Sequence, residues 1–377
     1  MSHRFRNARR VVIKIGSALL NDTKNLRLNR TWLEALADDV EMCRARGQDV
    51  VIVSSGAIAM GRNALGLGTA RLKLEESQAA AAVGQIALAH AYSRALQERG
   101  METAQVLLTL DDTEDRRRYI NARNTLTCLL KMGVVPVINE NDTVATTEIR
   151  YGDNDRLAAR VTGMVSADCL VLLSDVDGVY TSDPALGQGG KLIPEIRELT
   201  PEIWAMARDS GSSLSRGGMR TKLEAARMAQ STGAHMVITS GKILRPLKNL
   251  QEGGRCTWVP ADEAPMAARK KWISGSLKPV GVLIVDAGAV RALQSGKSLL
   301  PAGISGVKGK FEKGDAVRVE DQTGLELGRG IVSYGHEEAA RIIGRNSADI
   351  AQILGYDGRT EMIHRDDLVV SKGLSDG

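Results

Sequence analysis

Residues 11–17 read Val-Val-Ile-Lys-Ile-Gly-Ser, a short aliphatic run that contains one lysine and ends in glycine and serine. Such a run predicts a strand that is buried on both faces of a sheet. A longer stretch with helical periodicity follows at 31–46, and the next aliphatic run lies at 50–53. Aliphatic runs and helical stretches keep alternating up to about residue 255. This pattern predicts an α/β fold, in which a mostly parallel sheet lies between two layers of helices.

The same alternation predicts the remaining elements of this part of the chain. We expect further strands at 106–110, 134–138, 169–174 and 236–239. We expect further helices through 64–66 and at 78–99, 121–131, 153–162 and 221–232. In open sheets of this kind, ligands bind in a crevice at the carboxyl ends of the strands.

The sequence changes character after Gly254, where two prolines and the basic stretch 269–272 lead into short β-like segments. We therefore predict a first domain at 1–258, a linker at 259–276 and a second domain at 277–371. For the second domain we expect a small β-rich barrel with helices on its outside. Its expected strands are 280–285, 316–319, 330–332 and 368–370, and its expected helices are 337–342 and 347–354.

The composition favours a soluble protein with aliphatic cores. Of the 377 residues, 43% are hydrophobic but only 3% are Phe, Trp or Tyr. The net charge of +5 favours acidic ligands without requiring nucleic acid. The cysteines are too far apart for a zinc site or a disulfide framework; they are Cys43, Cys128, Cys169 and Cys256. No apolar stretch is long enough for a signal peptide or a membrane span, so we expect a cytoplasmic protein.

A candidate phosphate-binding loop lies at 214–222, Leu-Ser-Arg-Gly-Gly-Met-Arg-Thr-Lys, directly before an Ala-rich helical stretch. Gly217 and Gly218 allow backbone N–H groups to approach an anion closely, and the helix N-terminus adds partial positive charge. Arg220 and Lys222 add full charges. The alternative is a flexible basic turn on the surface.

Two strand ends nearby have a similar character. Lys14 lies inside an aliphatic run, and a buried lysine without a partner is costly, so we expect it to meet a bound anion. The alternative is that its side chain reaches solvent at the strand end. Residues 54–56, Ser-Ser-Gly, open the helix that follows the strand at 50–53 and could hold an anionic group, although an ordinary N-cap serine explains them as well.

Polar clusters occupy three further segments: 139–143 (Asn-Glu-Asn-Asp-Thr), 151–156 (Tyr-Gly-Asp-Asn-Asp-Arg) and 174–180 (Ser-Asp-Val-Asp-Gly-Val-Tyr). N-capping explains one acid of the second cluster but not all of them. Asp153 or Asp155 could hold Mg²⁺, or could orient the lysines by charge pairing. The third cluster suggests a loop that contacts a nucleotide, or a plain turn.

Two common nucleotide motifs are missing from the sequence. Residues 296–298, Gly-Lys-Ser, resemble the end of a Walker A motif, but Arg291 stands where its first glycine should be. No Gly-x-Gly-x-x-Gly opens a helix either, which disfavours a dinucleotide oxidoreductase. Lysines, Gly/Ser loops and acids at one sheet edge suit phosphoryl transfer, where the protein mainly positions reactants and neutralises charge.

Six of these segments, in this order and spacing, closely resemble the amino-acid kinase family and, within it, the bacterial members that phosphorylate glutamate. They are Val-Ile-Lys-Ile-Gly-Ser, Ser-Ser-Gly-Ala-Ile, Ile-Asn-Glu-Asn-Asp, Gly-Asp-Asn-Asp, Ser-Asp-Val-Asp-Gly-Val-Tyr and Gly-Gly-Met-x-Thr-Lys. From about residue 277 the chain, including 298–304 and 364–367, resembles the PUA domain that many of those enzymes carry. The resemblance covers nearly the whole chain.

The resemblance implies ATP-dependent phosphorylation of the γ-carboxylate of L-glutamate to γ-glutamyl phosphate, the first step toward proline. It implies that glutamate is bound by Ser55, Asp142 and Asn154. It implies that Lys14 and Lys222 stabilise the transferring group and that Asp155 holds both lysines. It implies an ATP site that includes Lys14, Ser174, Asp175, Arg216, Gly217, Gly218, Met219, Arg220, Thr221 and Lys222. Arg216 departs from the family pattern, which usually has a small residue there.

The resemblance also implies binding partners. Mg²⁺ is expected to arrive with ATP, without direct ligation by the protein. Proline is expected to inhibit at or beside the glutamate site, and family members commonly form homo-oligomers.

Two rival functions remain. The first is a kinase of the same family that acts on aspartate, acetylglutamate, carbamate or a nucleotide. The second is RNA binding, because PUA domains occur in proteins that act on RNA. Residues 277–377 contain 13 Lys and Arg against 14 Asp and Glu, whereas an RNA-binding module should have a basic face.

Overall fold

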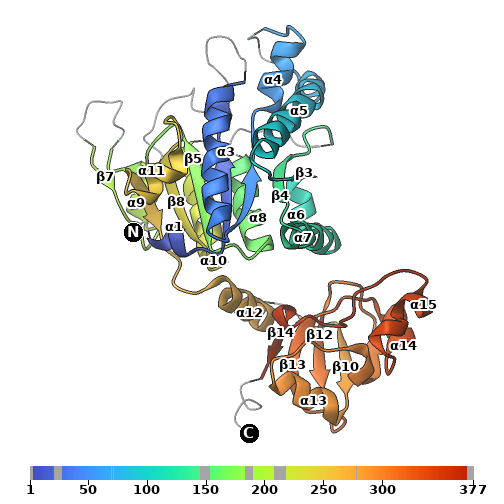
Figure 1. Ribbon diagram of the computed structural model, residues 1–377. Helices are drawn as coiled ribbons and strands as arrows, with labels where there is room; N and C mark the ends of the chain where they lie inside the picture. The colour runs from blue at the N-terminus through green and yellow to red at the C-terminus, as the bar shows by residue number, and fades with distance from the viewer. Residues whose placement is uncertain are drawn as a thin grey trace. The chain divides into compact units, whose positions relative to one another are not determined.

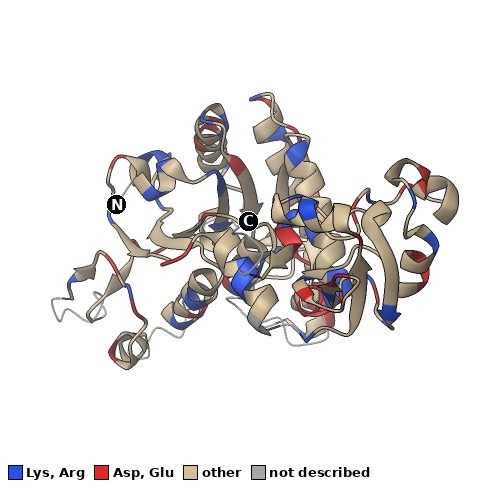
Figure 2. Cartoon of the chain, turned by 90° about the horizontal axis from the view of Figure 1, so that it is seen from below, with Lys and Arg blue, Asp and Glu red and all other residues tan. Residues whose placement is uncertain are grey.

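The computed structural model describes residues 3–20, 28–68, 70, 72–144, 153–182, 190–207, 218–276 and 278–371. The chain forms two compact units, Met1–Pro265 and Met266–Gly377. Among the described residues, no helix has both the length and the apolar character needed to cross a lipid bilayer. Figure 2 shows that basic and acidic residues are interspersed along the chain.

The first unit is built on a seven-stranded sheet with the order β3-β4-β2-β1-β5-β8-β9 (Figure 1). Its strands are β1 (Arg10–Ile15), β2 (Asp49–Val53), β3 (Thr103–Leu108), β4 (Val135–Glu140), β5 (Cys169–Ser174), β8 (His235–Ser240) and β9 (Cys256–Val259). All neighbours pair in parallel except β9, which is antiparallel to β8. The chain extends the sheet first on the β2 side of β1 and then on its β5 side. A topological switch point, where such sheets bind ligands, therefore lies beside β1.

Helices cover both faces of this sheet (Figure 1). They are α1 (His3–Asn7), α2 (Ser17–Leu20), α3 (Arg30–Ala45), α4 (Ala57–Ala64), α5 (Leu74–Gln97), α6 (Leu110–Glu114), α7 (Arg116–Lys131), α8 (Asp153–Met164), α9 (Pro201–Met206), α10 (Met219–Ser231) and α11 (Pro246–Gln251). Side chains from α1, α3, α5 and α11 form one core, and side chains from α7, α8 and α10 form the other. The α/β fold and the mostly parallel sheet are thus confirmed.

Alternation along β1 decides which face each of its side chains joins. Val11, Ile13 and Ile15 belong to the core under α3 and α5, whereas Val12 belongs to the core under α8 and α10. Because side chains of a strand alternate between faces, Lys14 points to the same face as Val12. The one lysine of this strand therefore faces α8 and α10.

The structure corrects the lengths of several predicted helices. The helix expected at 121–131 begins at Arg116, where the Asp115 side chain accepts a hydrogen bond from the Arg118 N–H at 2.9 Å. The helix expected at 78–99 begins at Leu74. In both cases polar first turns precede the apolar pattern on which the prediction rested. The prediction also missed β9 and the hairpin of β6 (Val179–Tyr180) and β7 (Leu192–Ile193), which are too short to show a period.

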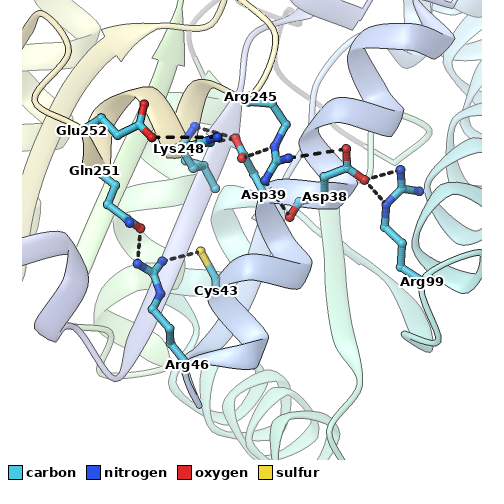
Figure 3. Close-up of polar contacts among 10 residues, drawn as sticks. Asp38, Asp39, Cys43, Arg46, Arg99, Arg245, Lys248, Gln251 and Glu252 are labelled. Carbon is cyan, nitrogen blue, oxygen red and sulfur yellow. Dashed lines mark hydrogen bonds and ion pairs between the residues drawn. The ribbon is translucent and has the colours of Figure 1, made fainter.

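A buried carboxylate joins α3 to the loop that follows β8 (Figure 3). Asp39 is fully buried, and its Oδ1 accepts a hydrogen bond from Arg245 Nε at 2.7 Å. Its Oδ2 accepts hydrogen bonds from the backbone N–H groups of Leu247 and Lys248 at the start of α11. Asp39 therefore replaces the missing partners of a helix N-terminus, and it fixes this edge of the sheet.

The second unit has a core of its own around a five-stranded mixed sheet with the order β11-β10-β12-β13-β14. Its elements are α12 (Pro265–Ser276), β10 (Gly281–Val285), α13 (Ala287–Gln294), η2 (Pro301–Gly303), β11 (Ile304–Gly309), β12 (Ala316–Glu320), β13 (Glu326–Ile331), α14 (His336–Ile342), η3 (Ser347–Asp349), α15 (Ile350–Leu354), η4 (Arg365–Asp367) and β14 (Leu368–Val370). The β-rich character is confirmed. The strand expected at 330–332 is the end of the longer β13, and the helix expected at 347–354 is divided between η3 and α15.

Residues 265–276, which we expected within a linker, form α12. Arg269 on this helix is buried and donates two hydrogen bonds to Asp367 Oδ1, at 3.0 and 2.6 Å. This ion pair attaches α12 to the second unit. The domain boundaries drawn from the sequence remain a proposal.

Candidate active site

Four neighbouring strands of the first unit end in polar residues. Lys14 lies near the end of β1, Ser54 and Ser55 follow β2, Asn139 lies near the end of β4, and Ser174 ends β5. The parallel register places Lys14 beside Val53 on one side and beside Leu172 on the other. These residues therefore share the carboxyl edge of the sheet, where the switch point predicts a ligand.

A buried carboxylate from α8 holds two lysines at this edge. The Asp155 side chain is fully buried, and its Oδ1 lies 2.6 Å from Lys14 Nζ. Its Oδ2 lies 3.5 Å from Lys222 Nζ, and the Thr221 hydroxyl donates to the same oxygen at 3.0 Å. Both lysines are at least nine-tenths buried. Lys14, Asp155, Thr221 and Lys222 are called the clamp below.

Burial alone would raise the pKa of Asp155, because it disfavours the charged form. The ammonium groups of Lys14 and Lys222 outweigh burial and hold the pKa below its ordinary value. Asp155 is therefore ionised at neutral pH, and one excess positive charge remains among the two lysines and this carboxylate. An anion that enters the site meets that excess charge.

Helix packing brings the parts of the clamp together. α8 and α10 both pack into the core that Val12 joins, so Asp155 and Lys222 approach Lys14 from the same face of the sheet. One turn away from the clamp, Arg156 Nη2 lies 2.6 Å from Glu224 Oε2 and joins the same two helices. This second link limits sliding of α8 along α10.

Asn154, next to Asp155 in the sequence, organises the other side of the site. Its Nδ2 lies within hydrogen-bond distance of the Ser54 carbonyl (2.8 Å), Ser55 Oγ (2.9 Å) and Asn139 Oδ1 (3.2 Å). The Nδ2 of Asn139 in turn donates to Gln85 Oε1 at 2.7 Å. Asn154 Oδ1 is buried and receives no hydrogen bond within the described parts of the chain. Gln85, Asn139, Asn154 and Ser55 form what we call the amide network.

Close helix packing supports the Ser54–Gly56 turn of this network. Gly56 has a φ of +100°, a left-handed conformation that glycine adopts without strain. The helix that follows, α4, packs directly on α5: a Cβ on Gly61 would lie 1.7 Å from the Ala80 carbonyl oxygen, and one on Gly84 would lie 1.8 Å from that of Ala57. Only glycine fits at these two positions. The pairs Ala57/Gly61 and Ala80/Gly84 share a spacing of four residues, and this small-residue pattern is the signal from which the contact could have been predicted.

The turn after β5 is held against β9. The Ser174 hydroxyl donates to Asp175 Oδ1 at 3.0 Å, and the Ser174 carbonyl accepts from the Gly241 N–H at 2.7 Å. A few residues on, Arg255 donates to the Tyr180 hydroxyl at 2.9 Å and lies 3.0 Å from Asp177. Asp175 remains exposed beside this braced turn.

The structure treats the predicted site residues differently. It brings Lys14, Asp155, Thr221 and Lys222 together in the clamp, and Ser55 and Asn154 together in the amide network. Asp142 is mostly buried in the turn after β4. Gly218 caps α10. The Met219 side chain packs partly into the core, and the exposed Arg220 side chain pairs with Glu224 at 3.3 Å.

Arg216 and Gly217 lie outside the described residues. The sequence analysis missed Gln85, which lies on an Ala-rich helix far from every motif. The roles assigned to the individual site residues stay predictions.

Two family models match the chain. The model of the amino acid kinase family matches residues 9–240, and that of the PUA domain matches residues 281–354. The chain is 60% identical to the glutamate 5-kinase of Paramagnetospirillum magneticum, over 96% of this chain and 98% of the relative. It is 58% identical to the glutamate 5-kinase of Nitrobacter hamburgensis, over 96% of each chain.

Solved structures are more distant. Carbamate kinase from Giardia lamblia bound to AMP-PNP is 18% identical with a TM-score of 0.49, over 68% of this chain and 100% of that one. UMP kinase from Bacillus anthracis is 18% identical with a TM-score of 0.48, over 68% of this chain and 97% of that one.

Proposed function

Because this chain belongs to the amino acid kinase family, we propose that it transfers the γ-phosphoryl group of ATP to the γ-carboxylate of L-glutamate. The product is γ-glutamyl phosphate, and the reaction is the first step of proline biosynthesis. Relatives that are glutamate 5-kinases and match this chain from end to end support the choice of acceptor. The observation that carries the chemistry is the clamp, a pair of buried lysines held by one carboxylate at the sheet edge.

The reaction needs charge neutralisation more than proton transfer. The γ-carboxyl of glutamate has a pKa of about 4.3, so it is already ionised at neutral pH and requires no general base. One of its oxygens forms a bond to the γ-phosphorus, and the bond from that phosphorus to the β–γ bridging oxygen breaks. ADP leaves with the electron pair. Lys14 and Lys222 offset the repulsion between the two anionic reactants, and Asp155 keeps both ammonium groups at the transferring group.

The amide network and Asp142 bind glutamate in this proposal. The Ser55 hydroxyl is suited to a substrate carboxylate, and the Asp142 carboxylate is suited to the α-ammonium group. Asn154 Oδ1, buried and not bonded to any described residue, offers a second acceptor for that group. A substrate without an α-ammonium group leaves these acceptors unpaired, which is costly in a buried site.

ATP occupies the β5 and α10 side. Ser174, Asp175 and residues 216–222, which open α10, contact the nucleotide. Mg²⁺ neutralises phosphate charge and arrives with ATP. Asp155 does not fit a metal ligand, since both of its oxygens face ammonium groups, and the described residues include no cluster of three or more His, Cys, Asp or Glu suited to a metal.

Three further expectations belong to this proposal. Proline, which shares the α-carboxylate and a cationic α-nitrogen with glutamate, competes for the glutamate side of the site. The enzyme forms homo-oligomers. It works in the cytoplasm.

Acyl-phosphate trapping tests the proposal. The full chain is incubated with Mg-ATP, hydroxylamine and one acceptor at a time: L-glutamate, L-aspartate, acetylglutamate, carbamate or UMP. We expect ADP release and γ-glutamyl hydroxamate with glutamate, and suppression of both by proline. ADP release with another acceptor but not with glutamate would overturn the assignment.

A further inference from the structure

The Thr221 hydroxyl has one proton and two acceptors within reach. It lies 3.0 Å from Asp155 Oδ2 and 2.9 Å from the carbonyl oxygen of Gly218. A threonine near the start of a helix often bonds a carbonyl three or four residues back. Here the alternative partner is the carboxylate of the clamp, on a different helix.

The carbonyl of Gly218 does not depend on this hydroxyl. It also accepts a hydrogen bond from the Thr221 backbone N–H at 3.0 Å. When the hydroxyl donates to Asp155 instead, the carbonyl of the helix cap still has a donor. The proton of Thr221 can therefore move between the two acceptors by rotation about one side-chain bond.

The two lysines of the clamp are held unequally. Lys14 Nζ lies 2.6 Å from Asp155 Oδ1, whereas Lys222 Nζ lies 3.5 Å from Oδ2. The shorter contact has the length of a charge-assisted hydrogen bond and the longer one does not. Lys222 is thus the lysine that can leave Asp155 more readily, and Oδ2 is the oxygen that loses its cation when this happens.

We propose that Thr221 is a positioning residue, whose hydroxyl stabilises Asp155 Oδ2 while Lys222 turns toward the transferring phosphoryl group. The inference rests on the proposed kinase function and adds to it. A fully buried carboxylate oxygen without a donor is costly. The hydroxyl removes that cost at the moment when Lys222 is needed by the phosphate. Asp155 then keeps its charge and continues to orient Lys14.

This role differs from direct binding of ATP by Thr221, which the sequence resemblance implies. A hydroxyl that donates its single proton to Asp155 or to Gly218 cannot also donate it to a phosphate oxygen. Loss of the hydroxyl should therefore lower kcat and leave the KM for ATP nearly unchanged. A phosphate contact would show mainly in the KM for ATP.

The test compares Thr221→Val, which keeps the shape but removes the donor, with Thr221→Ser, which keeps the donor. Thr127→Val is the matched control, because the Thr127 hydroxyl donates to the Arg123 carbonyl within α7 at 2.7 Å and meets no carboxylate. We expect Thr221→Val to lower kcat about ten- to a hundredfold, the range for a lost hydrogen bond to a charged group. Thr221→Ser should stay within about threefold of wild type, and Thr127→Val should match it.

The pH profile gives a second readout that a purely structural role would not change. The Thr221 hydroxyl is one of the groups that lower the pKa of Asp155, together with Lys14 and Lys222. Its removal raises that pKa, so the acidic limb of kcat against pH should move to higher pH in Thr221→Val. A wild-type kcat in this variant, or a rise in the KM for ATP alone, would overturn the inference. Lack of glutamate-dependent turnover in the wild type would instead overturn the proposed function.

Discussion

Charged and neutral groups divide the site between two neighbouring residues of α8. Asp155 faces two buried lysines, whereas the Asn154 amide meets a backbone carbonyl, a hydroxyl and a second amide. Charge in a buried site acts on any anion that enters, because the Coulomb interaction has little directionality. Amides and hydroxyls act only on a partner with matching donors and acceptors. We conclude that the clamp provides rate for phosphoryl transfer, and that the amide network selects and orients the acceptor.

Removal of one clamp lysine should have the largest effect. Lys222→Ala deletes a cation that stabilises the transferring group, so we expect kcat to fall by roughly 10² or more, the scale seen when a transition-state donor is lost. Steady-state kinetics with glutamate and ATP measure this, and thermal melting checks the fold. Turnover at the wild-type rate in a folded variant would remove Lys222 from the site.

The support of the amide network should be the next most sensitive point. Gly84→Ala places a Cβ where 1.8 Å separates it from the Ala57 carbonyl oxygen, so α4 and α5 must move apart. We expect the free energy of unfolding to fall by about 1–3 kcal/mol, the usual cost of overpacking. The KM for glutamate should rise with it, because the Ser54–Gly56 turn moves with α4.

Urea unfolding followed by tryptophan fluorescence measures this loss, since Trp32 and Trp258 are buried in the first unit. Ala82→Ser, on the exposed face of the same helix, is the control and should change stability by no more than about 0.5 kcal/mol. Equal stability of Gly84→Ala and this control would show that the helices tolerate a wider separation.

Loss of the outermost amide should have the smallest effect. Gln85→Met removes the acceptor of the Asn139 side-chain N–H without much change of volume. One neutral hydrogen bond contributes about 1 kcal/mol, so we expect the KM for glutamate to rise about fivefold with kcat and the KM for ATP nearly constant. Gln97→Met, at the exposed end of the same helix, serves as the control. A fall in kcat at constant KM would assign Gln85 to the clamp side instead.

Sequence reasoning reached the clamp more readily than the amide network, and the reason is physical. A lysine inside an aliphatic strand conflicts with burial, so Lys14 marks a charge site by itself. Gln85 conflicts with nothing, because a polar residue on an Ala-rich helix is ordinary at the surface. Its part in the site depends on how closely α4 and α5 approach, and that distance is set by Gly61 and Gly84 rather than by any periodic pattern.

The second unit shows the same limit. β10 and β12 were predicted because they are rich in valine, isoleucine and leucine. β11 was missed because Gly306 and Gly309 interrupt its sequence. Its place in the sheet comes from pairing with β10, a contact between separate segments that local propensity does not contain.

Kinetics of Asn154→Ala and Asp155→Asn, measured side by side, test the division of the site most directly. We predict that Asn154→Ala raises the KM for glutamate about tenfold or more, with a smaller loss in kcat. Asp155→Asn should lower kcat by roughly 10² or more and change the KM for glutamate less than about threefold. If both substitutions changed the same kinetic parameter to a similar extent, the separation of rate from acceptor selection would be wrong.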